Sequence, residues 1–313
     1  MKLRLQHLKI EGSPNLDLMA ALRFGLVTRN ERSWSSTQLL EAMRRAGIES
    51  LCLRLPRLVA RVAYPPAASS DDTDLLEKLS ALIIRPIGRG SLEEIIFRMD
   101  LLYRLERLGM LVVNPPKSIE RAIDKYYALS LLEEHGLPVP RTAVTESPRE
   151  ALRAFHELGG DVVVKPLFGS RGVGSTRVSD PDVAERIFHS ISLHHGVLYL
   201  QEFISHGSSD IRAFVLGGRV LASMRRVAEG WKTNVSQGAR PVPVRLGEEM
   251  EELAVKASEV IGCMVAGVDI LESEEGPKVI EVNSQPGWRG LQTVTRVNIA
   301  DEIIRYLISV VKK

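Results

Sequence analysis

The chain has 313 residues, of which 44% are hydrophobic and 26% are charged, a composition typical of a soluble globular protein of two or three domains. Its 41 lysines and arginines nearly balance 39 acidic residues, so the overall charge gives no argument for binding to nucleic acid or to a membrane surface. The two cysteines, Cys52 and Cys263, argue against a disulfide framework or a zinc site, and without a signal peptide or membrane span we expect a cytoplasmic protein.

Strand and helix patterns alternate over roughly the first 115 residues, which predicts a parallel sheet with helices on its faces. A capping box at Ser91 and Glu94 opens a helix whose apolar residues recur every three or four positions, at Leu92, Ile95, Ile96, Met99, Leu102 and Leu105. The other predicted elements are a helix over 35–45 and strands over 24–28, 49–55, 81–84 and 110–113. Residues 58–70 contain prolines and small residues and are predicted to form a loop.

A second unit is predicted to begin near residue 118, with one helix over 119–134 and an extended segment over 137–142. A buried strand over 162–165 then ends at Lys165 and runs into a glycine-rich stretch over 167–175. Glycines let backbone N–H groups approach an anion closely, and the lysine adds a positive charge, so phosphate binding is favoured over a flexible hairpin turn. The spacing matches neither a Walker motif nor a dinucleotide fingerprint.

The third unit begins with a strand over 198–204 and a hairpin of residues 210–216 and 219–224 around Gly217 and Gly218. Alternation places Asp210 and Arg212 on one face of the hairpin. Asp210 could accept ribose hydroxyls while Arg212 binds a phosphoryl or carboxylate group, although an isolated Asp-x-Arg pattern more often forms a cross-strand ion pair.

Two β-branched stretches near the C-terminus, 266–271 and 278–284, flank a turn over 273–277 and predict another hairpin, centred near Glu275. This register sets Asp269 opposite Glu281, and Asn283 shares the face of Glu281. Facing carboxylates repel each other unless a positive charge lies between them, and Mg²⁺ prefers carboxylate and amide oxygens. The alternative is a pair of solvated acids on an edge hairpin.

The order and spacing of these residues resemble the ATP-grasp ligases. Lys125, Lys165 forty residues later, the glycine-rich loop, Gln201 to Ile204, Asp210-Ile-Arg212, Asn234, Asp269 and Glu281-x-Asn283 carry the resemblance, which runs from about Phe24 to the C-terminus. Within the family the chain looks like the group typified by the ribosomal-protein glutamate ligases, which add glutamate to carboxylate acceptors. The resemblance implies an α/β (α+β) ATP-grasp fold: an N-terminal Rossmann-like parallel-sheet domain over 1–118, a central lid domain over 119–203 and a C-terminal antiparallel-sheet domain over 204–313.

The same resemblance implies roles for individual residues. Arg212 and Lys165 would serve catalysis, with Arg212 steadying an acyl-phosphate intermediate, and Asp269, Glu281 and Asn283 would hold one or two Mg²⁺ or Mn²⁺ ions. Two departures, Arg171 in the loop and Gly238-Ala239 where many relatives have two glycines, leave ATP binding intact and bear on the acceptor. The residues expected to bind ATP are Lys125, Lys165, Gly169, Ser170, Gly172, Gly174, Gln201, Glu202, Phe203, Asp210, Lys232, Thr233 and Asn234.

A narrower resemblance concerns the substrates. Residues 85–92, 120–127, 231–239 and 286–292 look like the tetrahydromethanopterin glutamate ligases, which implies L-glutamate and a pterin carboxylate as substrates and a homodimer or homotetramer. The same chemistry on a deazaflavin coenzyme, a ribosomal-protein tail or a lysine-biosynthesis carrier protein is the first alternative. A nucleotide-binding protein without turnover is the second.

Several further side chains allow two interpretations. Arg29, Arg85, Arg89 and Arg289 lie in segments expected to border the acceptor site, where cations would suit an acidic acceptor, but each can equally be a surface arginine. Trp288 can stack on a pterin ring, although packing beneath the final helix, predicted over 299–311, is preferred. Five histidines lack metal-binding spacing and are predicted to be solvated: His156, His189, His194, His195 and His206.

Overall fold

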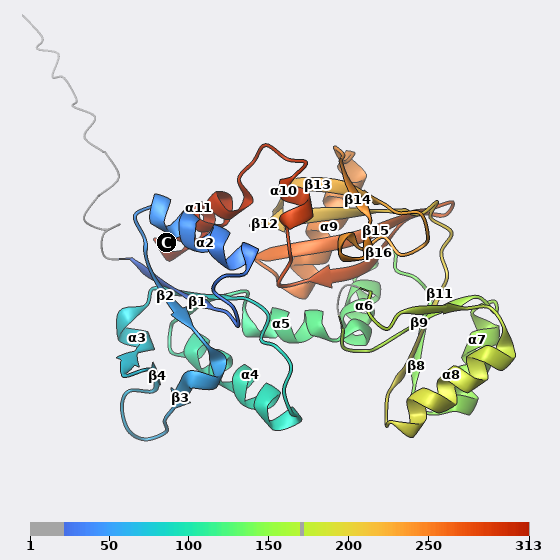
Figure 1. The fold of residues 1–313 in the computed structure, drawn as a ribbon, viewed down its shortest axis with the longest axis horizontal. Helices are drawn as coiled ribbons and strands as arrows, with labels where there is room; N and C mark the ends of the chain where they lie inside the picture. Colours follow the sequence, from blue (N-terminus) through green and yellow to red (C-terminus); the bar gives the residue numbers. More distant parts are fainter. Residues whose placement is uncertain (1–21, 170–171, 313) are drawn as a thin grey trace, which may run out of the picture.

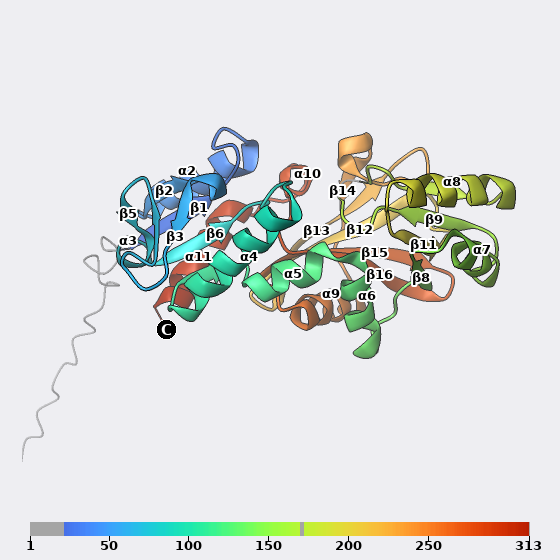
Figure 2. The same cartoon turned by 90° about the horizontal axis from the view of Figure 1, so that it is seen from below.

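The computed structural model describes residues 22–169 and 172–312, so the predictions for Ser170 and Arg171 lie outside the described residues. Three larger sheets follow one another along the long axis of the molecule (Figures 1 and 2), and the C-terminal sheet lies between the other two. Among the described residues, no helix is long and apolar enough to cross a membrane. The proposed domain boundaries after residues 118 and 203 remain a prediction.

The N-terminal sheet is parallel throughout, in the order β2-β1-β6-β7, as the alternating pattern predicts. Phe24 and Leu26 of β1 pack with α2 and the C-terminal helix α11, whereas Val27 packs on the opposite face with α4. The capping box at Ser91 is confirmed. The elements are β1 (Arg23–Val27), α2 (Trp34–Arg45), β2 (Glu49–Leu53), β6 (Ala81–Ile84), α4 (Leu92–Arg107), β7 (Leu111–Val113) and α11 (Ile299–Val311).

One prediction for this region is wrong. Residues 58–70 are not a loop, because Leu58 and Ala68 are buried and their segments pair in a small antiparallel sheet, β3-β4-β5. In α4 the first turns are not buried: Leu92 is 77% exposed, whereas Arg98 is 8% exposed. The added elements are η1 (Leu55–Arg57), β3 (Leu58–Ala60), β4 (Ala68–Ser70), β5 (Thr73–Asp74) and α3 (Leu75–Lys78).

The helix predicted over 119–134 is in fact two helices, α5 (Pro116–Ile123) and α6 (Lys125–Glu134). Asp124 breaks the pattern because its backbone is extended and its carboxylate accepts a hydrogen bond from the Tyr127 N–H at 3.0 Å, which makes it the N-cap of α6. The break places Lys125 in the first turn of α6, where it faces the glycine-rich loop.

The central sheet is antiparallel, in the order β10-β9-β11-β8, and α7 and α8 cover one face of it (Figure 1). Val162 and Val164 of β9 pack beneath these helices, so alternation turns Lys165 to the other face. The same holds for β11, where Leu198 and Leu200 face the helices. The elements are β8 (Thr142–Thr145), α7 (Pro148–Glu157), β9 (Val162–Lys165), β10 (Thr176–Val178), α8 (Pro181–Leu193) and β11 (Leu198–Glu202).

The C-terminal sheet is antiparallel, in the order β14-β13-β12-β15-β16. One face packs against α6 and α9. The other carries Phe214 toward Trp288, which joins the core around α2 and α11, so its predicted packing near the final helix is confirmed. The elements are β12 (Ser209–Leu216), β13 (Arg219–Val227), η2 (Val235–Gln237), β14 (Arg240–Pro243), α9 (Glu248–Ile261), β15 (Val265–Ser273), β16 (Gly276–Asn283) and α10 (Arg289–Gln292).

Candidate active site

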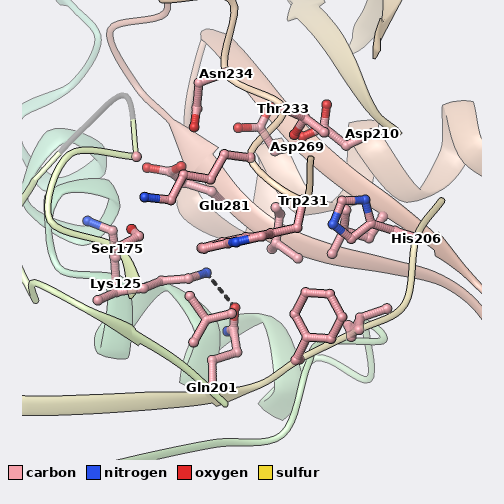
Figure 3. A pocket seen from close by; sticks show the side chains of 18 of the residues that line it. Lys125, Ser175, Gln201, His206, Asp210, Trp231, Thr233, Asn234, Asp269 and Glu281 are labelled. Carbon is pink, nitrogen blue, oxygen red and sulfur yellow. Dashed lines mark hydrogen bonds between the residues drawn. The ribbon is translucent and has the colours of Figure 1, made fainter. Parts of the chain in front are cut away.

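A pocket of about 930 Å³, counting its open mouth, lies between the central and C-terminal sheets. Figure 3 shows side chains from both sheets and from α6 converging on it. The predicted site residues that line the pocket are Lys125, Lys165, Gly169, Gly172, Gln201, Glu202, Phe203, Asp210, Lys232, Thr233, Asn234, Asp269 and Glu281. Three predicted site residues within the described part of the chain, Gly174, Arg212 and Asn283, do not line it.

The predicted pairing of Asp269 with Glu281 is confirmed by the register of β15 and β16. The two-residue turn is Glu274-Glu275, and a regular continuation of this hairpin would set Asp269 opposite Ile280. A bulge after Asp269 shifts the register by one residue and brings Glu281 opposite. Burial and the neighbouring Asp269 carboxylate together raise the pKa of Glu281.

Asp269 is held by two arginines. Arg212, directly opposite on β12, forms a bidentate ion pair with it, and Arg226 of β13 lies 3.1 Å from the same carboxylate. Burial alone would raise the pKa of Asp269, but the two guanidinium groups outweigh it and the pKa is lowered. Both carboxylate oxygens of Asp269 therefore accept hydrogen bonds from Arg212 in this structure. The geometry supports the interpretation of Arg212 as a partner in a cross-strand ion pair.

Asp210 pairs with Arg226 rather than Arg212. Arg226 lies opposite it in the β12–β13 register and donates to both carboxylate oxygens. Burial nevertheless raises the pKa of Asp210. Sequence reasoning missed Arg226, because the predicted strand ended at Met224.

Two lysines supply positive charge from the opposite side of the pocket. Lys125 donates to the carbonyl oxygens of Leu167 at 3.3 Å and Gly169 at 2.9 Å. Lys165 donates to Gln201 Oε1, the contact drawn as a dashed line in Figure 3. Burial lowers the pKa of both lysines, to about 8 for Lys165, with the charge of Glu281 acting in the opposite sense. Both are therefore cations without a fully compensating anion.

The described residues of the glycine-rich loop that line this pocket are Gly169, Gly172, Val173 and Ser175. Gly172 has a φ of +67°, and a Cβ at this position would collide with Asn234 Oδ1. The glycine is thus required both by the left-handed backbone and by the close approach of the loop to the 232–234 segment.

Replacing Gly172 by Ala is expected to weaken ADP binding roughly tenfold, because the left-handed conformation and the contact with Asn234 are both lost. Isothermal titration measures the dissociation constant. Gly159→Ala is the matched control, since its φ is +95° but no atom lies within 4 Å of the added Cβ. Equal affinities for the two variants would show that the contact with Asn234 has no role in binding.

Charged side chains hold Glu202 and Phe203, at the end of β11, in place. Glu202 accepts from Arg141 and from Lys278, which joins the central sheet to β16, and these partners lower its pKa against the effect of burial. Phe203 lies beneath the Arg177 guanidinium at 3.4 Å from the ring centroid. The backbone N–H groups of Glu202 and Phe203 donate to the carbonyl oxygens of Arg141 and Asp161, each at 3.0 Å, so ligand binding by this segment remains a prediction.

Two aromatic side chains of the pocket, Trp231 and His206, were not predicted as site residues. Trp231 lies in the pocket, with its ring 6.3 Å from that of Phe203 in an edge-to-face arrangement. His206 also lines the pocket and is half-buried, so its prediction as a solvated surface histidine is wrong, while the other four are exposed. The signal for Trp231 was its position next to Lys232, since aromatic rings serve as stacking platforms for bases.

The donor set fits a nucleotide with a divalent cation. The Asn283 amide nitrogen lies 3.4 Å from the carbonyl of Gly267, which leaves its amide oxygen for a ligand. The described residues contain no group of three or more His, Cys, Asp or Glu side chains arranged as a metal site, so two carboxylates and an amide would need phosphate oxygens to complete the coordination. This is the arrangement expected of a cation that arrives with a nucleotide.

Comparisons with known proteins agree with this geometry. The profile of the RimK-like ATP-grasp domain matches residues 122–307. The tetrahydromethanopterin:alpha-L-glutamate ligase of Methanococcus maripaludis is 34% identical over 288 residues, covering 90% of this chain and 97% of its own length. The enzyme of that name from Methanocaldococcus jannaschii is 41% identical over 244 residues, covering 76% of this chain and 82% of its own.

Solved structures show a similar fold. The ATP-grasp ligase PsnB, complexed with minimal precursor, Mg and ADP, superposes with a TM-score of 0.73 at 21% identity, covering 94% of this chain and 99% of that one. An identity this low supports the fold alone. The predicted α/β (α+β) ATP-grasp fold, with an N-terminal parallel sheet and a C-terminal antiparallel sheet, is confirmed.

Proposed function

Because this chain belongs to the family of RimK-like ATP-grasp glutamate ligases, we propose that it joins L-glutamate to an acceptor carboxylate through an acyl-phosphate intermediate. Ligases of this family use ATP with a divalent cation. The observation that carries the proposal is the pairing of Asp269 with Glu281 across a pocket from Lys125 and Lys165. We assign the two carboxylates and Asn283 to one or two Mg²⁺ or Mn²⁺ ions.

The chemistry starts from a poor electrophile. An oxygen of the acceptor carboxylate attacks the γ-phosphorus of ATP, and ADP leaves. The amine of glutamate then attacks the acyl carbon of the intermediate, inorganic phosphate leaves, and the nitrogen loses a proton as the amide forms. When bound, the divalent cation neutralises negative charge on the phosphates during transfer.

The residues of this chain bind, orient and exclude water. Lys125 and Lys165 hold the phosphates, and the loop around Gly172 covers them, which keeps water from the acyl phosphate. We assign the nucleotide base to the surroundings of Trp231 and the Glu202-Phe203 segment, and the ribose to Asp210. Arg212 pairs with Asp269 in this structure, and a cation held by Asp269 would leave its guanidinium to pair with the acyl phosphate.

We propose a tetrahydromethanopterin-type pterin as the acceptor, because relatives that carry this name match most of the chain. The alternative acceptors are a deazaflavin coenzyme, a ribosomal-protein tail and a lysine-biosynthesis carrier protein. Purified protein is incubated with ATP, Mg²⁺, L-glutamate and each acceptor in turn, and mass spectrometry measures the product. A gain of one glutamyl unit on the pterin alone is the expected result, and a gain on another acceptor instead would reassign the substrate.

A further inference from the structure

The connections of the N-terminal sheet diverge between two neighbouring strands. From β1 the chain passes through α2 to β2 on one side, and from β6 it passes through α4 to β7 on the other. In open parallel sheets, ligands bind outside the carboxyl ends of the strands at such a switch point. Arg29 follows the end of β1 and Arg85 follows the end of β6, so the sheet places an arginine on each side of this point.

Arg85 is a half-buried cation with only neutral partners. Its guanidinium donates to the carbonyl oxygen of Pro286 at 3.1 Å and to Ser35 Oγ at 3.4 Å, and it lies 5.1 Å from the centroid of the Trp288 ring. No carboxylate of the described residues lies within ion-pair distance of it. Burial lowers the pKa of Arg85 to about 10, with no neighbouring anion to oppose the effect. A charge that is partly removed from water and has no ion-pair partner is one to which a bound anion can supply the counter-charge.

Other unsatisfied donors belong to the same segment. Gln285 Nε2 and Trp288 Nε1 are buried without a hydrogen-bond partner among the described residues, although buried N–H groups are nearly always paired. They flank Pro286, whose carbonyl accepts from Arg85. A bound oxyanion would supply the acceptor atoms that these N–H groups lack.

The same segment leads directly to the candidate active site. A Cβ at Gly267 would lie 2.6 Å from an Arg212 guanidinium nitrogen and 3.0 Å from Pro286 Cβ, so Pro286 and Arg212 are close neighbours. Pro286 thus accepts a hydrogen bond from Arg85 and lies close to Arg212, which pairs with Asp269. Arg85 is therefore connected to the candidate active site through Pro286.

The loop after β6 is held in one shape. Arg98, 8% exposed, donates to the carbonyl oxygens of Ile87 at 3.2 Å and Arg89 at 3.0 Å. Gly88, with a φ of +83°, has no Cβ and so leaves room for the side chain of Arg29, which packs against it. Arg98 is thus a positioning residue that fixes the loop carrying Arg85 and Arg89.

We propose that Arg85, with Arg29 at the rim, binds a second oxyanion of the acceptor, a carboxylate or phosphate group adjacent to the carboxylate that is ligated. The inference rests on the proposed ligase function and names its substrate class: acceptors that carry at least two acidic groups at the reacting end. L-Glutamate is the other possible source of an oxyanion here, and the experiment separates the two.

The first measurement needs no turnover. Trp288 lies beside Arg85, and Trp34 packs against Trp288. A Trp231→Phe background removes the tryptophan of the nucleotide pocket, so intrinsic fluorescence then reports on this site. Glutarate is the probe. We expect a saturable change in fluorescence as glutarate is added. Arg85→Met should raise the dissociation constant at least tenfold, and Arg29→Met should raise it less. The control is Arg107→Met, an exposed arginine at the far end of α4, which should leave the constant unchanged. An unchanged constant in Arg85→Met overturns the proposal.

The second measurement assigns the source. With the acceptor that gains a glutamyl unit, Arg85→Lys is expected to raise KM for the acceptor about tenfold, because lysine cannot bind an oxyanion bidentately. KM for ATP and for L-glutamate should stay unchanged, and a rise in KM for L-glutamate instead overturns the assignment. If Arg85→Met does not fold, Arg29→Met and Arg85→Lys decide the glutarate measurement, and unchanged affinity in both refutes the site. If no acceptor is ligated, the ligase function fails while the glutarate measurement still tests the site.

Discussion

Replacement of Glu281 by Gln is expected to reduce ADP formation on the order of 10³-fold while the protein still folds. The carboxylate faces Asp269 across the β15–β16 hairpin, and glutamine keeps its shape but removes the negative charge. Since burial and Asp269 raise the pKa of Glu281, the native fold already disfavours its charged form, and the substitution should not lower thermal stability. The loss should therefore appear in turnover and not in the melting temperature.

A coupled assay of ADP release across a range of Mg²⁺ concentrations measures this effect. Glu274→Gln is the control, because Glu274 is an exposed residue in the turn of the same hairpin. Activity of Glu281→Gln that recovers at high Mg²⁺ would indicate a weakened metal site, as the assignment requires. Wild-type activity at every Mg²⁺ concentration would show that Glu281 does not bind the metal.

The parts of the fold that sequence predicts well are those set by local patterns. Residues 81–84 and 162–165 are strands with the predicted bounds because short apolar runs end at polar or turn residues, and the final helix matches its predicted range. The break at Asp124 was missed because the apolar spacing continues across it, and only the capping hydrogen bond to Tyr127 reveals it. The small sheet in residues 58–74 depends on pairing within a proline-containing segment, for which no local pattern gives a signal.

In the candidate site, too, features set by local sequence are predicted and features set by strand pairing are not. The lysines, the loop and the 232–234 segment follow from residue type and order, but the partner of Asp210 depends on strand register. A regular hairpin around Gly217-Gly218 would set Asp210 opposite Arg225. The bulge between Phe214 and Val215 shifts the register by one residue and places Arg226 there instead. Such a bulge is a property of the packed sheet, so the sequence predicts the acidic residues better than their arginine partners.

Nucleotide affinity is expected to fall as the pH rises through about 8, and Lys165 is the group responsible. Its pKa is lowered to about 8 by burial, so the side chain is a cation below this pH and neutral above it. Bound phosphates stabilise the cation and raise its pKa, which means that binding above pH 8 takes up a proton. The dissociation constant should then increase by up to about tenfold per pH unit, because each unit costs about 1.4 kcal/mol.

Titration of ADP without divalent metal, from pH 7 to pH 9, measures this dependence free of any metal at Asp269 and Glu281. Lys165→Arg should bind more weakly at pH 7 but show little dependence on pH, because a guanidinium stays charged throughout this range. Lys117→Arg, at an exposed position of α5, should keep the wild-type profile. The charge of Glu281 opposes the lowering of both lysine pKa values, and the lowered pKa of Lys125 acts in the same sense as that of Lys165. A Lys165→Arg profile that still falls through pH 8 would therefore assign the proton to Lys125 and leave Lys165 with only its hydrogen bond to Gln201.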